Sequence, residues 1–299
     1  MEFRLRLPGS TSNLGPGYDA LGLALSIYNH ITIKTRSRPG VSITVEGEGL
    51  GILSTDENNL IYHAANFTAQ RAKKTLPGLD LHMQNHIPLA RGLGSSSTAI
   101  VAGVVLANHL IGEPFSQNEM LNIATEIEGH PDNVSPCLLG GFTASAIDNN
   151  RVACVHALPP TELRAVVAIP EFELKTKEAR NALPDTLSLT DAVFSISRAC
   201  LVTAAMITGD LNQLATGMQD RLHQPHRTKL IPGFDCILQK ATENGALGAA
   251  LSGAGPTLLA LTTKNADAIG QAMIDIWHKK GIAACYQVLD IDPHGATLE

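Results

Sequence analysis

The sequence predicts an α+β fold in two domains. Segments with alternating apolar residues, typical of strands, and segments with apolar residues three or four positions apart, typical of helices, both occur along the 299 residues and do not alternate strictly. Pro159-Pro160 is the best candidate for a boundary and gives domains 1–158 and 159–299. A composition of 44% hydrophobic and 17% charged residues is sufficient for a substantial core.

The first half of the chain contains most of the expected strands. Phe3, Leu5 and Leu7 alternate with two arginines, which is the pattern of a half-buried strand. By the same reasoning we expect strands at 28–34, 41–45 and 79–83, a helix at 57–74, and a hairpin of strands 142–147 and 152–156 that turns at Asn149-Asn150.

Two helices carry clear end signals. Ser116 and Glu119 form a capping box before a helix that Gly129 should end. Ser188, followed three residues later by Asp191, should begin a long helix in the second half. The same half should contain strands at 164–169, 246–251, 257–262 and 283–289, and helices after Pro232-Gly233 and over 266–280.

Bulk properties exclude several functions. A net charge of −6 argues against broad nucleic-acid binding, which needs a basic face. No apolar run reaches the roughly 18 residues that a membrane span needs, and the N-terminus has no signal-peptide core. The five cysteines are scattered and odd in number, which predicts reduced thiols and a cytoplasmic location.

Residues 88–98, Pro-Leu-Ala-Arg-Gly-Leu-Gly-Ser-Ser-Ser-Thr, are the most informative segment. Gly92 and Gly94 allow a tight turn and a close approach of backbone to a ligand. Ser95–Ser97 stand where the N-cap of the apolar helix 99–111 belongs, and a helix N-terminus attracts anions. We predict a phosphate cradle that is not a Walker loop, because no Gly-Lys-Ser/Thr follows the glycines. The alternative is an ordinary loop capped by serine.

Three segments in this order, 8–22, 88–98 and 251–257, resemble the signatures of the GHMP kinases, which are small-molecule kinases without a Walker loop. The stretches 128–136, 176–184 and 227–233 make the chain most similar to the members that phosphorylate L-homoserine. The sequence departs from the family pattern at three positions, where Gly9, Tyr18 and Thr98 replace alanine, phenylalanine and alanine.

The resemblance implies the two-domain GHMP-kinase fold. Its N-terminal half is a mixed β/α domain like the second domain of ribosomal protein S5, and its C-terminal half is a ferredoxin-like α/β sandwich. It also implies ATP-dependent phosphorylation of L-homoserine to O-phospho-L-homoserine, the step before threonine synthesis, and is compatible with a homodimer. Two alternatives stay open: a family kinase for another small alcohol, or a non-catalytic metabolite-binding member.

The resemblance also assigns the nucleotide and metal sites. Glu128 would bind Mg²⁺ with help from Ser96, whereas Glu126, two residues away on the helix, should point elsewhere. Spacing alone would make Glu128 an ordinary solvated residue at a helix end. The ATP loop would comprise Pro88, Leu89, Ala90, Arg91, Gly92, Leu93, Gly94, Ser95, Ser96, Ser97 and Thr98.

Eight residues fall on positions that the family uses for the amino-alcohol substrate: Asn13, Asp19, His130, Asn133, Thr176, Arg180, Arg227 and Gly253. Asp19 would take the ammonium group, and Arg180 and Arg227 the carboxylate, which a guanidinium matches bidentately. Asn13 and Asn133 would align the hydroxyl and, with Arg180, make up the catalytic set. The alternative for Asn13 and Asp19 is turn formation beside Gly15-Pro16-Gly17. Whether Asp132 acts as a general base stays open.

Overall fold

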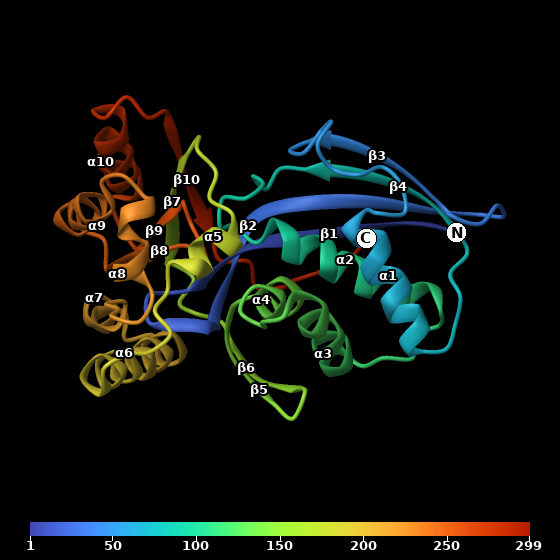
Figure 1. Cartoon of the computed structure of the whole chain (residues 1–299), viewed down its shortest axis with the longest axis horizontal. Helices are drawn as coiled ribbons and strands as arrows, with labels where there is room; N and C mark the ends of the chain where they lie inside the picture. The colour runs from blue at the N-terminus through green and yellow to red at the C-terminus, as the bar shows by residue number, and fades with distance from the viewer.

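A sheet of seven strands dominates the first half of the molecule (Figure 1). The computed structural model describes residues 1–299. The strand order is β11-β1-β2-β4-β3, with a β5–β6 hairpin attached to β2. The bounds are β1 (Glu2–Asn13), β2 (Gly17–Arg36), β3 (Val41–Gly47), β4 (Gly78–Asn85), β5 (Phe142–Asp148), β6 (Arg151–Ala157) and β11 (Thr297–Leu298).

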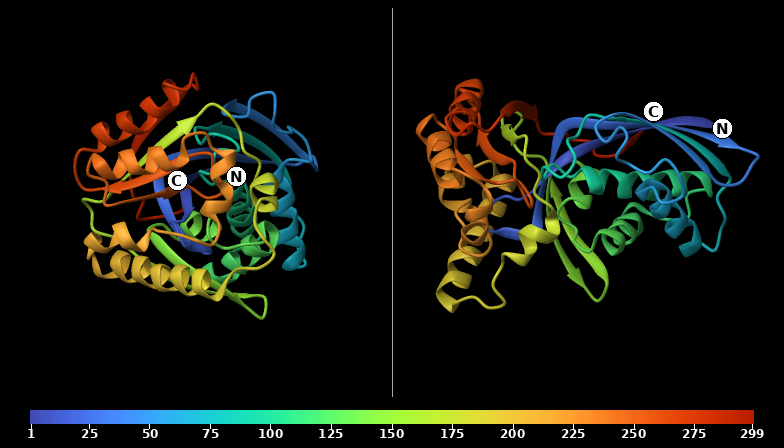
Figure 2. Two further views of the ribbon diagram at one scale, coloured as in Figure 1. Left: turned by 60° about the vertical axis from the view of Figure 1, so that its left-hand side comes forward. Right: turned by 45° about the horizontal axis from the view of Figure 1, so that its top comes forward.

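Four helices cover one face of this sheet (Figure 2). They are α1 (Leu60–Arg71), α2 (Ser95–Leu110), α3 (Gln117–Glu128) and α4 (Val134–Leu139). Helix α2 is apolar all round, so it lies in the centre of this layer, against α1, α3 and β1. The resulting core of 25 buried residues includes α2 side chains from Ile100 to Ala107 and so fixes the helix against the sheet.

The second half contains a separate antiparallel sheet of order β10-β7-β9-β8. Its strands are β7 (Arg164–Pro170), β8 (Gly248–Leu251), β9 (Leu258–Thr262) and β10 (Ala284–Asp290), and the order is that of a ferredoxin-like sandwich. The helices of this half are α5 (Thr176–Asn181), α6 (Leu189–Thr208), α7 (Leu214–Gly217), α8 (Gln224–Arg227), α9 (Phe234–Glu243) and α10 (Ala266–His278), with 3₁₀ turns at Leu211–Gln213 and Thr228–Leu230. The expected fold class is confirmed.

The two halves share a hydrophobic core. Leu14, Leu21 and Leu23, around the β1–β2 turn, cluster with Val202 and Met206 of α6. The chain end also returns to the first half, where β11 pairs with β1. The boundary at 158/159 stays a prediction, because a shared core and a returning strand join the two halves.

Most end signals act as the sequence predicts. The capping box of Ser116 and Glu119 is present, Gly129 ends α3 with a φ of 94°, and the Ser188 side chain accepts a hydrogen bond from the Asp191 amide. The β5–β6 hairpin turns at Asn149 and Asn150, both with positive φ. The short helices α4 and α5 were not predicted, because six residues are too few to show a helical period.

The predicted cap of α2 is wrong. Gly94 is the N-cap residue, in the left-handed region at φ 75°, and no side chain caps the helix. The three serines therefore form the first turn of α2, which leaves their hydroxyls available to other partners. Glycine can adopt this φ without steric cost, whereas a serine N-cap needs extended backbone.

Helix α6 differs from the expectation about apolar length. It has 20 residues and a mean hydropathy of 1.4, which is enough to cross a membrane by length and composition. Asp191 and Arg198 interrupt its apolar run, so counting uninterrupted apolar residues missed it. One such helix is weak evidence for a membrane protein, and α6 packs against α7, the 3₁₀ turn at Leu211–Gln213 and β2. All five cysteines are free, as expected.

Candidate active site

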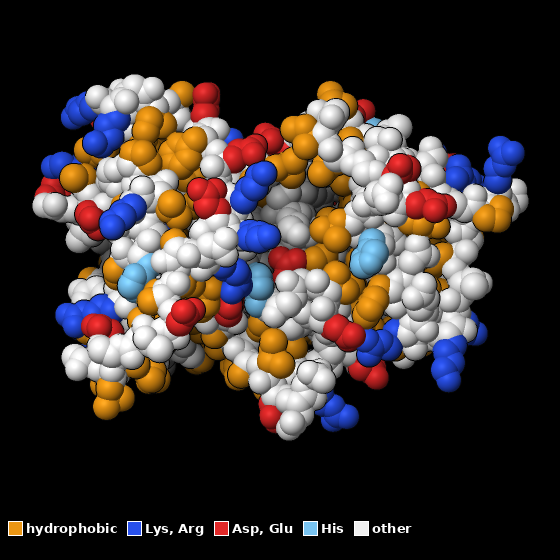
Figure 3. Space-filling view, in the orientation of Figure 1, with side chains coloured by type: hydrophobic (Ala, Val, Ile, Leu, Met, Phe, Trp, Pro, Cys, Tyr) orange, Lys and Arg blue, Asp and Glu red, His pale blue; other side chains and the backbone are white.

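A polar cavity of about 310 Å³ lies where the two halves meet. In the space-filling view the surface is hollowed there, with Lys and Arg side chains along the edge formed by the second half (Figure 3). The cavity is lined by nine of the eleven residues of the expected ATP loop, by Glu128, and by all eight expected substrate residues. The two exceptions, Leu89 and Thr98, lie elsewhere: Leu89 lines a neighbouring cavity, and Thr98 is buried there behind hydrogen bonds to Asn29 and Ser95.

The loop before α2 is shaped by two glycines that also contact protein. A Cβ on Gly92 would lie 2.2 Å from the Ser252 carbonyl oxygen, and one on Gly94 would lie 2.2 Å from Ser10 Oγ. Both glycines have φ near 75°. The loop is thus locked between β1 and the 252–256 turn. Ser95, Ser96 and Ser97 of the first turn of α2 line the cavity, and a helix N-terminus at this position suits an anion.

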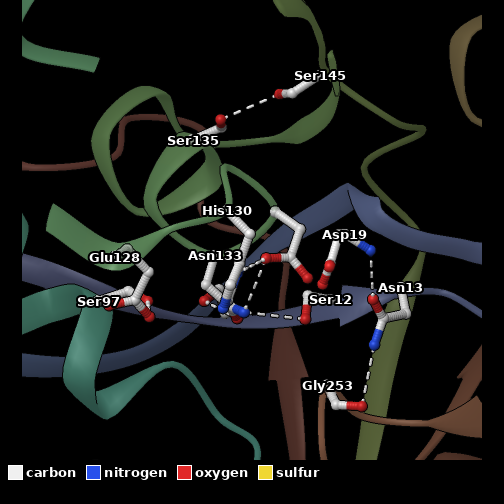
Figure 4. Close-up of polar contacts among 12 residues, drawn as sticks. Ser12, Asn13, Asp19, Ser97, Glu128, His130, Asn133, Ser135, Ser145 and Gly253 are labelled. Atoms are coloured by element: carbon white, nitrogen blue, oxygen red, sulfur yellow. Dashed lines mark hydrogen bonds and ion pairs between the residues drawn. The ribbon is translucent and has the colours of Figure 1, made fainter. Parts of the chain in front are cut away.

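Glu128 meets the first turn of α2 from the end of α3 (Figure 4). Its carboxylate accepts a hydrogen bond of 2.8 Å from Ser97 Oγ, and Ser96 Oγ lies 3.5 Å away. Burial raises the pKa of Glu128, and the hydrogen bond from Ser97 only partly opposes this. The end of α3 also disfavours a carboxylate, so this group is a ready partner for a cation.

Glu126 points elsewhere, as predicted. Its carboxylate is exposed and forms an ion pair with Arg71 of α1 at 2.5 Å. The two-residue offset on the helix therefore separates a surface ion pair from a carboxylate that lines the cavity.

An ion pair crosses the opposite side of the cavity. Arg180 of α5 holds the Asp19 carboxylate bidentately, at 2.7 and 3.0 Å. Each side chain is about one-third exposed, at 36% and 33%. Asp19 has a φ of 55°, and its backbone N–H donates to Asn13 Oδ1 while its carboxylate meets Arg180.

The two asparagines hold the site's backbone together. Asn13 Nδ2 donates to the Gly253 carbonyl oxygen at 3.0 Å, and its Oδ1 accepts from the Asp19 amide at 3.0 Å (Figure 4). Asn133 Oδ1 accepts from Ser10, and Nδ2 donates to Ser12, both at 2.9 Å. Each carboxamide retains hydrogen-bonding capacity for a ligand, but each also fixes the β1–β2 turn.

His130 and Asp132 form a close pair of 2.5 Å between Nδ1 and Oδ1. Burial lowers the pKa of His130, but the hydrogen bond and charge of Asp132 outweigh it and raise that pKa overall. With Asp19 these residues form a cluster that could hold a cation. Arg180 already neutralises Asp19 and His130 occupies Asp132, so Glu128 is the better metal ligand.

Arg227 lines the inner wall of the cavity and is only 1% exposed. Its guanidinium donates to the carbonyl oxygens of Ala179 and Gly253, at 3.1 and 3.2 Å, and lies 3.2 Å from His223 Nδ1. His223 is fully buried, and burial lowers its pKa to about 4. The neutral imidazole accepts from Arg227 and donates to the Gly15 carbonyl oxygen at 2.7 Å, so α8 supports the β1–β2 turn.

A second cavity, of about 410 Å³, adjoins the serine turn and was not predicted. Its lining is largely apolar, with Ile52, Leu53 and Met83 among nine hydrophobic residues. Asn85 is 3% exposed, and its Nδ2 donates to the Glu48 carbonyl oxygen, which leaves Oδ1 without a partner. No local sequence pattern identifies this cavity, because its residues come from the loop after β3 and from α1, β4 and α2.

Comparison with known proteins identifies relatives of this chain. The GHMP kinase N-terminal domain family matches residues 59–141, and the GHMP kinase C-terminal family matches residues 202–279. A homoserine kinase of Synechococcus sp. is 43% identical, over 100% of this chain and 98% of the relative. The chain belongs to the GHMP kinase family.

Further relatives within the family agree. A homoserine kinase of Carboxydothermus hydrogenoformans is 44% identical, over 93% of this chain and 90% of its own length. The crystal structure of homoserine kinase from Cytophaga hutchinsonii covers 100% of this chain and 97% of its own, with a TM-score of 0.91 and 31% identity. A putative homoserine kinase from Listeria monocytogenes covers 99% of each chain, with a TM-score of 0.81 and 35% identity. The predictions of a kinase and of its fold are confirmed.

Proposed function

We propose that this GHMP kinase transfers the γ-phosphoryl group of ATP to the hydroxyl of L-homoserine. The observation that carries the proposal is the pairing of opposite charges in the 310 Å³ cavity beside the serine turn. Asp19 offers a carboxylate to an ammonium group, and Arg180 and Arg227 offer guanidiniums to a carboxylate. An amino acid presents both groups, whereas mevalonate and shikimate carry no ammonium.

The second cavity supports ATP as the phosphoryl donor. Its apolar walls suit a purine ring, and it shares Ala90, Ser95 and Ser96 with the lining of the polar cavity. The unpartnered Oδ1 of Asn85 is a hydrogen-bond acceptor, which complements the exocyclic amine of adenine. Guanine would present a carbonyl oxygen at that position, so this acceptor favours ATP over GTP.

The residues around Glu128 fit a magnesium ion. Mg²⁺ prefers one or two carboxylates together with phosphate oxygens and water, and Glu128, with the hydroxyls of Ser96 and Ser97, supplies oxygen donors only. Burial raises the Glu128 pKa, so a cation would relieve an unfavourable charge. When bound, the ion neutralises charge on the phosphates.

The protein's own part in the reaction is positioning and charge neutralisation. The N-terminal end of α2 binds phosphate oxygens, and Arg180 and Asp19 orient the substrate for in-line attack. Asn13 and Asn133 retain capacity to align its hydroxyl. Asp132 is 2% exposed and already accepts hydrogen bonds from His130 and Asn133, which favours a mechanism without a dedicated protein base.

ADP release in a coupled assay tests the proposal. L-Homoserine should support turnover, whereas L-serine, mevalonate and shikimate should support little. L-Serine is the sharpest comparison, because it carries the same charged groups and a hydroxyl one methylene closer to them. Preference for another alcohol would identify a different kinase of the family, and no ADP release with any alcohol would indicate a non-catalytic member.

We also propose a homodimer through α6. Leu189, Val193, Ile196 and Ile207 form an exposed apolar stripe along this helix, with 80% of Leu189 and 63% of Ile196 accessible. If the α6 helices of two protomers pack antiparallel, their apolar stripes contact each other. Asp210, just beyond the C-terminal end of α6 in one protomer, then lies beside the positive N-terminal end of α6 in its partner. Sedimentation should show a dimer that Ile196→Glu dissociates and Val155→Glu, on exposed β6, does not. A monomeric parent protein would contradict this arrangement.

A further inference from the structure

Tyr18 has no assigned role, and it lies between the two arginines of the cavity. Its oxygen accepts a hydrogen bond of 2.7 Å from Arg180 Nη1. The guanidinium carbons of Arg180 and Arg227 each lie 5.4 Å from the centre of its ring, and the ring of His223 lies 5.2 Å from the same centre. The phenol therefore stands at the point where the two guanidiniums converge.

The phenol O–H is free to donate. The oxygen of Tyr18 accepts from Arg180, and the structure gives its hydrogen no acceptor in the protein. Burial raises the pKa of Tyr18, and the charge of Asp19 adds to this, while the two arginines act in the opposite direction. The group is therefore protonated near neutral pH, and Tyr18 lines the cavity, where its O–H can meet a ligand.

We propose that Tyr18 is a third recognition residue for the α-carboxylate of the substrate, donating its O–H to a carboxylate oxygen held between Arg180 and Arg227. The proposal rests on the proposed function, since it names how an amino-acid substrate is bound. Arg180 is already hydrogen bonded to the phenol oxygen of Tyr18, so a substrate carboxylate oxygen placed against Arg180 would lie beside that phenol. Two guanidiniums and one hydroxyl then satisfy more of its lone pairs than the guanidiniums alone.

The ring and the hydroxyl have separable effects. An aromatic face beneath two guanidiniums stabilises them against their mutual repulsion, and phenylalanine would retain this. Only the hydroxyl distinguishes a carboxylate from other groups. Tyr18→Phe should therefore leave the ring contacts intact and remove one hydrogen bond to a charged group.

The test compares L-homoserine with 3-aminopropanol, which keeps the ammonium and hydroxyl groups and lacks the carboxylate. Tyr18→Phe should raise KM for L-homoserine about tenfold, equivalent to about 1.4 kcal/mol, with KM for ATP unchanged and 3-aminopropanol affected less than about twofold. Tyr28→Phe is the matched control, since its hydroxyl donates to Asp292 outside the cavity. Tyr28→Phe should leave KM unchanged for both L-homoserine and 3-aminopropanol.

The Arg180→Leu background separates direct recognition from positioning. If the phenol contacts the carboxylate, Tyr18→Phe should still lower the preference for L-homoserine over 3-aminopropanol in that background. An unchanged preference there would overturn the proposal, because Tyr18 would then act only through Arg180. Equal losses for both substrates in the parent background would overturn it as well. A parent enzyme inactive with L-homoserine would instead overturn the proposed function, and this inference with it.

Discussion

Replacing Arg180 with leucine tests how the cavity binds a zwitterion. In the structure Arg180 has no partner of opposite charge other than Asp19, which it holds at 2.7 and 3.0 Å. A bound amino acid would place its carboxylate against Arg180 and its ammonium against Asp19. Both protein charges would thereby keep an opposite charge, which a substrate with only one of the two groups could not provide.

The magnitude follows from the burial of the pair. Removing one partner of a buried charged contact costs about 2–5 kcal/mol, but exposed ion pairs are worth no more than about 1 kcal/mol. Arg180 and Asp19 are about one-third exposed, at 36% and 33%, so we take the lower end of the buried range. About 2 kcal/mol corresponds to a loss of roughly 30-fold in kcat/KM for L-homoserine.

The assay measures kcat/KM for L-homoserine and for two analogues. 3-Aminopropanol lacks the carboxylate, and 4-hydroxybutyrate lacks the ammonium group. Arg180→Leu should reduce the preference for L-homoserine over 3-aminopropanol. Asp19→Asn should reduce the preference over 4-hydroxybutyrate. Arg180→Lys should rescue only partly, because lysine cannot form two parallel hydrogen bonds.

Equal impairment of L-homoserine and 3-aminopropanol by Arg180→Leu would refute this reasoning. Arg180 would then serve the transferred phosphoryl group or the fold instead of the carboxylate. Thermal unfolding of the variant separates these two outcomes, since only a structural role lowers the melting temperature along with activity.

Three further predictions concern the nucleotide side. Glu128→Gln should abolish most Mg²⁺-dependent turnover yet raise the melting temperature of the metal-free protein at pH 7. Burial raises the pKa of Glu128 in the folded protein above its ordinary value of 4.5, so the ionised carboxylate destabilises the fold at pH 7. The stability gained by the substitution should therefore shrink as the pH falls toward 4.5 and the carboxylate becomes protonated. Glu126→Gln should change neither the turnover nor the melting temperature in this way. If Glu126→Gln lost activity and Glu128→Gln did not, the metal assignment would be wrong. Gly94→Ala should remove the ATP-induced shift in melting temperature and destabilise the loop, because its Cβ would meet a serine of β1. Gly112→Ala, with similar φ and open space, should lower the melting temperature only, so a matching loss of ATP binding would count against the loop. Asn85→Leu should raise KM for ATP about tenfold and reduce the preference for ATP over GTP, and unchanged nucleotide kinetics would show that its Oδ1 does not read the base.

The continuous sequence motifs predicted residues that the structure places around one cavity, while their roles toward nucleotide and substrate stay predictions. The glycines and serines of 88–98 and the Glu128-Gly129-His130 stretch carry their chemistry in local order, and the structure brings them to one cavity. The sequence did not predict Gly94 as the helix cap, because its left-handed φ and its close approach to Ser10 of β1 appear only in the folded chain.

By itself, the sequence determined the types of secondary structure, several helix ends other than the start of α2, and the family, since these depend on periodicity, caps and ordered motifs. The tertiary structure alone decided which charges neutralise one another. Arg180 and Asp19 are 161 positions apart in the chain, and Ser97 and Glu128 are 31 apart. Their pairing depends on how α5 packs on the β1–β2 turn and how α3 ends beside α2. Residues so distant meet only through the fold, so the second cavity, the support of Arg227 by His223 and the place of Tyr18 between two arginines have no local sequence pattern.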